Sequence, residues 1–153
     1  MKKSITFTLL AALLLSLSAC GGEEAAAPAD LQGLYESYAA QLPDMFLPDE
    51  DTMMNFLGID TADCTRYVVS ICGDGMRADE VWLIEAKDDA SLKRLRELAE
   101  TRIQAKLDET ESYAPDQYAV VQKAELLTKG KYLALLISPE VDVLKAGFEA
   151  AVS

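Results

Sequence analysis

The sequence of 153 residues contains no histidine. Histidine is the commonest general base near neutral pH and the commonest ligand of transition metals, so its absence argues against both kinds of site. The Gly-x-Ser-x-Gly elbow, the Ser-x-x-Lys pair, the phosphate-binding loop and the dinucleotide fingerprint are missing too, and Gly73-Asp74-Gly75 is too short to be more than a turn. We therefore predict no catalytic residue, no cofactor and no metal site.

Basic residues are scarce. The chain has 14 Lys and Arg against 26 Asp and Glu, which gives a net charge of −12 at pH 7. Nucleic acid and anionic lipid surfaces would be repelled, so neither is an expected partner. The acidic run Pro48-Asp49-Glu50-Asp51 does not keep the spacing of an EF-hand loop and favours the start of a short helix instead.

Long apolar runs are also missing, apart from one at the N-terminus. Lys2 and Lys3 precede an apolar run over 7–17, which is too short to cross a bilayer as a permanent helix of roughly 20 residues. This order is typical of a secretory signal peptide. Leu17-Ser18-Ala19-Cys20 then resembles the lipobox of bacterial lipoproteins, in which the chain is cut before a lipidated cysteine. We predict a signal peptide over 1–19 and a membrane anchor through lipid on Cys20.

The segment after Cys20 lacks large apolar residues as far as Ala29. Such a composition cannot pack a core, so residues 20–29 are expected to form a lipidated flexible tether. The rest of the chain, 30–153, has the length of a single globular domain.

Two cysteines fall inside that domain, Cys64 and Cys72. The residues between them predict one strand, and eight steps at about 3.3 Å separate its ends by roughly 26 Å. A disulfide tolerates only about 7 Å between Cα atoms. We therefore expect two reduced cysteines.

The domain alternates between helical and strand patterns. Two short helices are expected first, Asp30 to about Gln41 and Pro48 to Leu57. A first hairpin of strands 64–72 and 81–84 follows, and then a long helix over 88–111. A second hairpin of strands 118–127 and 132–137 precedes a short helix from Pro139. The order predicts an α+β fold, with a four-stranded, mainly antiparallel sheet from two hairpins packed by the long central helix and shorter terminal helices. Val81 to Ile84 is apolar on both faces, which favours a central strand.

Arg102 occupies an unusual position on the long helix. At 100° per residue it falls inside the apolar stripe of Leu92, Leu95, Ala99 and Ile103. A buried guanidinium needs a partner, and Asp79 and Glu80 at the start of the neighbouring strand are the nearest candidates. Two interpretations stay open: a structural ion pair, or a charge cluster that binds a ligand.

Four short motifs carry a family resemblance: Ala78-Asp79-Glu80 before an apolar strand, Arg102 in the long helix, Tyr113-Ala114-Pro115 after it, and Gly130-Lys131-Tyr132 at the second turn. Together they resemble an uncharacterised lipoprotein family, a domain of unknown function common in clostridia and related Gram-positive bacteria. The resemblance implies that Cys20 lies on the outer face of a single cytoplasmic membrane. It implies no activity.

These observations support two functional hypotheses. The first is a non-enzymatic extracytoplasmic module that binds a small ligand or an envelope protein, because the chain has an anchor, a tether and a domain but no recognisable catalytic set. The alternative is a carboxylate-dependent hydrolase of the cell envelope. A deep cleft with clustered carboxylates would favour the hydrolase, and a shallow apolar or aromatic patch would favour binding.

Overall fold

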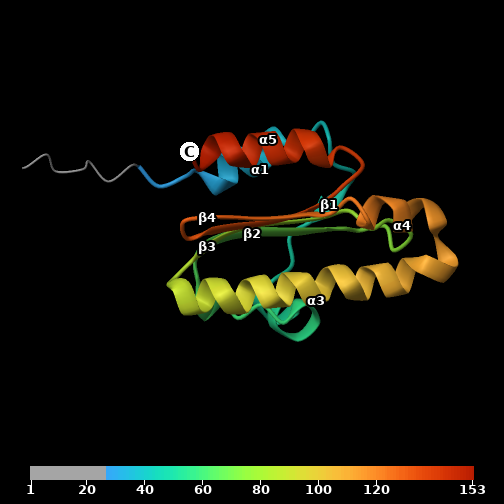
Figure 1. Ribbon diagram of the computed structural model, residues 1–153, viewed down its shortest axis with the longest axis horizontal. Helices are drawn as coiled ribbons and strands as arrows, with labels where there is room; N and C mark the ends of the chain where they lie inside the picture. The colour runs from blue at the N-terminus through green and yellow to red at the C-terminus, as the bar shows by residue number, and fades with distance from the viewer. Residues whose placement is uncertain (1–26) are drawn as a thin grey trace, which may run out of the picture.

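A computed structural model describes residues 27–153, and shows one sheet between two helical layers (Figure 1). Helices α1 (Leu31–Ser37) and α5 (Val141–Ala151) lie on one face, and the long helix α3 (Asp89–Tyr113) lies on the other. The signal peptide, Cys20 and most of the predicted tether lie outside the described residues. Within 27–153, no helix combines the length and apolar character needed to span a bilayer.

The fold is α+β, as predicted, with an antiparallel sheet of five strands in the order β1-β2-β3-β5-β4. The strands are β1 (Met45–Phe46), β2 (Cys64–Cys72), β3 (Glu80–Ala86), β4 (Glu125–Lys129) and β5 (Tyr132–Ile137). The bounds of β2 and β5 are those predicted. The fifth strand, β1, pairs with the end of β2 and was not predicted, because two residues are too few to show an alternating pattern.

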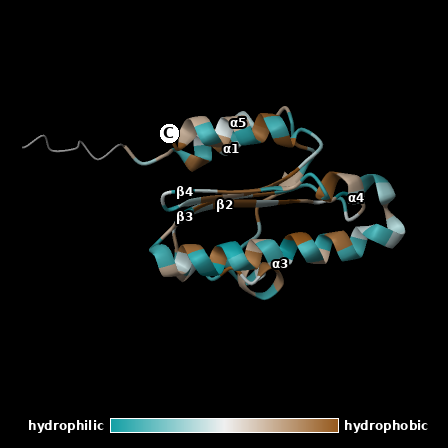
Figure 2. Ribbon diagram, in the orientation of Figure 1, coloured by the Kyte–Doolittle hydropathy of each residue, from teal (hydrophilic) through white to brown (hydrophobic). Residues whose placement is uncertain are grey.

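Strand β3 is the central strand, which confirms the prediction from its apolar composition. Trp82 and Ile84 belong to the core beneath α3, and Val81 and Leu83 belong to the core beneath α1 and α5. Every residue of β3 is buried. Figure 2 shows the hydrophobic colour along the strands, between the two helical layers.

The long helix is confirmed. Helix α3 begins after Asp88, whose side chain accepts a hydrogen bond from the backbone N–H of Ser91 and so caps the helix. Leu95 and Ala99 from its apolar stripe are fully buried against the sheet. Helix α1 begins after the predicted cap Asp30 but ends at Ser37, four residues before the predicted end.

The prediction of a strand over 118–127 is wrong in its first part. Residues Pro115–Val121 form helix α4, and β4 begins only at Glu125. Pro115 occupies the first turn of α4, where its missing N–H costs nothing. The β-branched Val120 and Val121 favoured a strand locally, but Val121 is buried in the core beneath α3, and this packing overrides the local preference.

The start of the domain is fixed to one end of the sheet. Ala29 is buried; its N–H donates to the Tyr132 hydroxyl over 3.1 Å, and its carbonyl accepts from Arg66 Nη1 over 3.2 Å. Arg66 also pairs with Glu85, near the end of β3. The chain therefore joins the domain where β2 and β5 begin and β3 ends.

Candidate functional site

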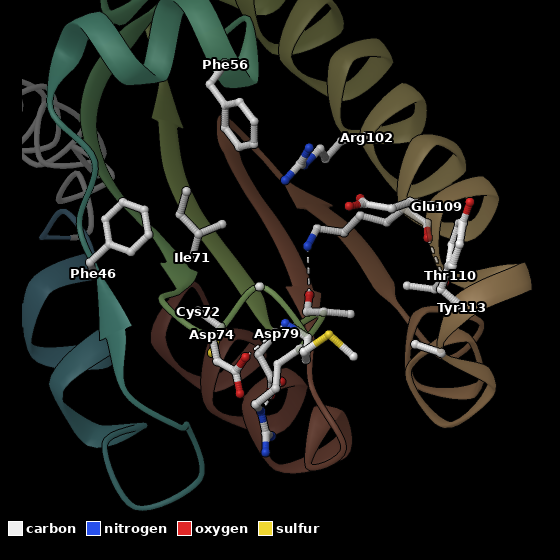
Figure 3. A pocket seen from close by; sticks show the side chains of 16 residues that line it. Phe46, Phe56, Ile71, Cys72, Asp74, Asp79, Arg102, Glu109, Thr110 and Tyr113 are labelled. Atoms are coloured by element: carbon white, nitrogen blue, oxygen red, sulfur yellow. Dashed lines mark hydrogen bonds and ion pairs between the residues drawn. The ribbon is translucent and has the colours of Figure 1, made fainter.

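A pocket of about 440 Å³ opens at the other end of β3. Its walls come from the C-terminal half of α3, the loop between β2 and β3, the edge strand β1 and the one-turn π-helix η1 (Met53–Leu57). Figure 3 shows Phe46 and Ile71 on one side of this pocket, Glu109, Thr110 and Tyr113 on the other, and Phe56 above. The volume is in the range of sites for small organic molecules.

Exposed apolar side chains surround the pocket. Phe46, Phe56, Met76 and Tyr113 line it, and their exposed fractions run from 46% to 84%. They are four of the seven large hydrophobic side chains that are exposed in residues 27–153. We call these four residues the apolar rim. Exposed apolar groups that gather at a concave site are typical of surfaces that bind a ligand or a partner protein.

The short helix η1 explains the position of Phe56. Met53 and Leu57 on this turn are buried in the core, which leaves Phe56 between them facing outward. Gly58 ends the turn with a φ of 74°, in the left-handed region that a side chain would strain. Phe56 thereby lies over Arg102, whose guanidinium carbon is 5.1 Å from the ring centroid, within cation–π distance.

Arg102 and Lys106 line the pocket, and behind them lies a buried carboxylate, Glu80. Arg102 donates to it through Nε (3.1 and 3.2 Å to the two oxygens) and Nη2 (2.9 Å). Lys106 Nζ lies 3.1 Å from Oε2, and Trp82 Nε1 donates to Oε1 over 2.8 Å. We call these four residues the Glu80 cluster. The Glu80 side chain is fully buried, and the side chains of Arg102 and Lys106 are only 15% and 9% exposed.

Of the two predicted partners, the structure brings Glu80 to Arg102 and leaves Asp79 to another arginine. Arg77 Nε donates to Asp79 Oδ2 over 3.0 Å, and this carboxylate raises the pKa of Arg77. Adjacent residues of an extended chain point to opposite sides, so Asp79 and Glu80 do not share one partner. The second oxygen of Asp79, Oδ1, is buried without a hydrogen-bond partner among the described residues.

Sequence reasoning missed Lys106 and the apolar rim. Lys106 could have been found, because it lies four residues after Arg102 and therefore on the same face of the helix. Phe46 and Phe56 carried no such signal. They come from segments distant in sequence, and only the packing of β1 and η1 brings them to α3.

The cysteines lie at opposite ends of β2, and both are free. Cys72 lines the pocket, whereas Cys64 lies at the far end of the strand. Burial, together with the charges of Asp63 and Asp60, raises the pKa of the Cys64 thiol to about 11. Within the part of the chain that the structure describes, no three His, Cys, Asp or Glu side chains come close enough to hold a metal ion.

The comparisons with known proteins give one match, to a family model. Residues 38–138 match the family described as Domain of unknown function (DUF4358). The chain belongs to this family. The DUF4358 match covers all five strands, α3 and the pocket residues, and leaves out α1 and α5. No curated protein and no solved structure matches the chain.

Proposed function

We propose that this DUF4358 protein is a non-enzymatic binding module of the cell envelope. A lipid on Cys20 anchors it to the outer face of the cytoplasmic membrane of a Gram-positive bacterium. Its pocket binds a small ligand. The other kind of partner that the apolar rim would suit is an envelope protein. The signal-peptide pattern over 1–19 and the lipobox at 17–20 support the anchor.

The position of the pocket supports its presentation to the outside. The chain joins the domain at the end of the sheet near Glu85, through Ala29, and the pocket lies at the end near Glu80. Glu80 and Glu85 are five steps apart along β3, which corresponds to about 17 Å. A domain that joins its tether at one end presents the opposite end away from the membrane.

One observation carries the proposal of binding: four exposed apolar side chains gather at a pocket whose base holds buried charges. The combination of an apolar wall with a few oriented polar groups is the usual composition of a ligand site. The alternative, a carboxylate-dependent hydrolase, has less support. Glu80 and Asp79 are each held by cationic side chains, and Asp74 and Glu109 lie exposed at the mouth.

A neutral fluorescent dye tests the binding proposal. The mature chain, residues 20–153 with Cys20→Ser so that no lipid takes up dye, is titrated with N-phenyl-1-naphthylamine. We expect saturable binding that Phe56→Ser weakens about 10-fold, because the exposed ring forms part of the apolar wall. The matched control is Val143→Ser. Val143 is 49% exposed and lies on α5, across the sheet from the pocket.

If Phe56→Ser and Val143→Ser have the same effect, or no saturable binding occurs, the pocket is not the binding site.

The anchor has a separate test. A labelled fatty acid should enter the wild-type protein and not Cys20→Ala, which should accumulate unprocessed. Equal labelling of the two proteins would contradict the lipoprotein proposal.

A further inference from the structure

We propose that the ligand of this pocket carries one anionic group, which Arg102 and Lys106 bind, on an aromatic or apolar body. The ligand class is thus a small organic monoanion, such as a carboxylate or sulfonate. This inference rests on the proposed binding function and adds the chemistry of the ligand to it.

The charges of the Glu80 cluster do not balance. Two cations, Arg102 and Lys106, share one carboxylate, so one positive charge remains in excess at the base of the pocket. Both cationic side chains are at least 85% buried, and bulk water therefore hydrates them poorly. A buried charge without a partner is costly, and an anion in the pocket would remove that cost. The chain is acidic overall, so a local excess of positive charge is unusual for this molecule.

The cluster also has hydrogen-bond donors to spare. Lys106 has three N–H groups; one donates to the carbonyl of Ala78 over 3.0 Å, and the ammonium also forms an ion pair with Glu80. Arg102 uses Nε and Nη2 for Glu80, and no hydrogen bond from Nη1 is found within residues 27–153. Both residues line the pocket, so the remaining N–H groups can reach a molecule bound there. One ligand oxygen for each cation satisfies this arrangement.

The apolar rim defines the other part of the ligand. Phe56 lies over the guanidinium of Arg102, and Figure 3 shows the two groups close together at the top of the pocket. An anion bound to Arg102 therefore places its attached body beside the Phe56 ring. Phe46, Met76 and Tyr113 supply further apolar surface around the same cavity. A ring or a branched aliphatic group fits this wall better than a polar chain does.

Two carboxylates at the mouth of the pocket oppose an anion. Asp74 and Glu109 are exposed to solvent. Asp79 also lines the pocket; Arg77 compensates its charge at Oδ2, and its buried Oδ1 has no hydrogen-bond partner among the described residues. Charges in water are screened within about 8 Å at physiological salt, whereas Arg102 and Lys106 would touch the anion in a poorly hydrated site. The direct contacts therefore dominate, and neutralising Glu109 should strengthen the binding of an anion.

A matched pair of dyes tests the inference. 8-Anilino-1-naphthalenesulfonate is N-phenyl-1-naphthylamine with one sulfonate added, so the two differ in the proposed anionic group. We expect the wild-type mature chain with Cys20→Ser to bind the sulfonate at least about 10-fold more tightly, since hydrogen bonds to charged groups contribute this much. Arg102→Gln and Lys106→Gln should each reduce the preference, and Glu109→Gln should increase it. Arg96→Gln, on the exposed side of α3, should leave it unchanged.

Circular dichroism of each variant shows whether it is folded, and the comparison of dyes on the wild-type chain needs no variant. Equal affinity for the two dyes, with no effect of Arg102→Gln or Lys106→Gln on folded protein, would overturn the anionic ligand while leaving an apolar pocket. Absence of saturable binding for both dyes would overturn the binding function itself.

Discussion

The central strand carries two buried carboxylates, Glu80 near its start and Glu85 near its end, and each one is shared by two cations. Glu80 pairs with Arg102 and Lys106. Glu85 pairs with Arg66 and Lys131, and we call these three residues the Glu85 cluster. The side chains alternate along β3, so the two clusters lie on opposite faces as well as at opposite ends.

The clusters differ in the exposure of their cations. Arg66 and Lys131 are 40% and 55% exposed, so water completes their solvation, whereas Arg102 and Lys106 are almost fully buried. Arg66 also holds the carbonyl of Ala29. Each cluster thus consists of one carboxylate and two cations. The Glu85 cluster fixes the start of the domain at one end of β3, and the Glu80 cluster is buried beside the pocket at the other end. The lesson is that burial of the partner cations, and not the ion pair itself, marks the candidate site.

The largest expected effect follows from removing the carboxylate of the Glu80 cluster. Glu80→Gln leaves two buried cations without a counter-charge, and we expect a loss of about 3 to 5 kcal/mol in the free energy of unfolding. Urea denaturation followed by circular dichroism measures it. A loss below about 1 kcal/mol would mean that water reaches this cluster as freely as it reaches the other one.

A smaller loss is expected from Arg102→Met. Lys106 and Trp82 still hold Glu80, and the excess positive charge is removed together with the hydrogen bonds of Arg102, so the free energy of unfolding should fall by only about 1 to 2 kcal/mol. The double variant with Glu80→Gln should cost less than the sum of the two single changes, because the two residues interact. The control is Arg96→Met, since Arg96 makes an exposed pair with Glu100 on the same helix and should contribute less than about 0.5 kcal/mol. Unchanged or higher stability of Arg102→Met would rule out a structural role for the pair.

At the other end of β3, Glu85→Gln should cost only about 1 kcal/mol, because Arg66 and Lys131 return to water. Burial acts to raise the pKa of Glu85, but the hydrogen bonds from Lys131 and Arg66 outweigh it and hold the pKa below its ordinary value. The ionised form is thus favoured in the folded state. The contribution of Glu85 is present above the pKa of the unfolded chain and is lost as the pH falls through the lower pKa of the folded state.

Unfolding of the wild type and Glu85→Gln at a series of acid pH values checks this sign. The difference in stability between the two proteins should shrink as the pH falls through this acid range. A difference that grows toward low pH would contradict the assignment.

The last comparison concerns the thiols at the two ends of β2, where no change in stability is expected. Because its pKa is raised to about 11, Cys64 has little thiolate at pH 8, and it should react with N-ethylmaleimide about 100-fold more slowly than an ordinary cysteine. Cys72 lines the pocket, so the sulfonate dye should slow its labelling and leave that of Cys64 unchanged. Peptide mass spectrometry over a time course resolves the two sites. Equal protection of both would indicate a general effect of the dye on the fold.

Most of the fold was predictable because its signals are local. Alternation and continuous apolar runs located β2, β3 and β5, and the absence of Gly and Pro located α3. The two errors arise where local signals are weak: β1 has two residues, and the valines of α4 favour a strand until packing decides otherwise. The predicted resemblance to a domain of unknown function is confirmed by the match to DUF4358, whereas its lipoprotein character and its bacterial group stay predictions.

The candidate site was predictable only in part. The helical wheel singled out Arg102, and the chain order placed Glu80 within reach, because both inferences depend on the geometry of single elements. The pocket itself depends on how η1, β1 and the loop before β3 pack against α3. That arrangement comes from tertiary packing, and the exposed Phe56 and Met76 carried no pattern that would reveal it.

The most direct test of the anionic ligand uses the indole of Trp82. The chain has one tryptophan, so ¹⁵N-labelled protein gives one indole N–H resonance, and that group donates to Glu80. An anion that binds Arg102 and Lys106 weakens their hold on Glu80 and changes this hydrogen bond. We predict that 1-naphthylacetate shifts the resonance saturably and that 1-naphthylacetamide, its neutral counterpart, does not. A resonance that stays unmoved by saturating naphthylacetate, or that moves equally with the amide, would contradict the proposal.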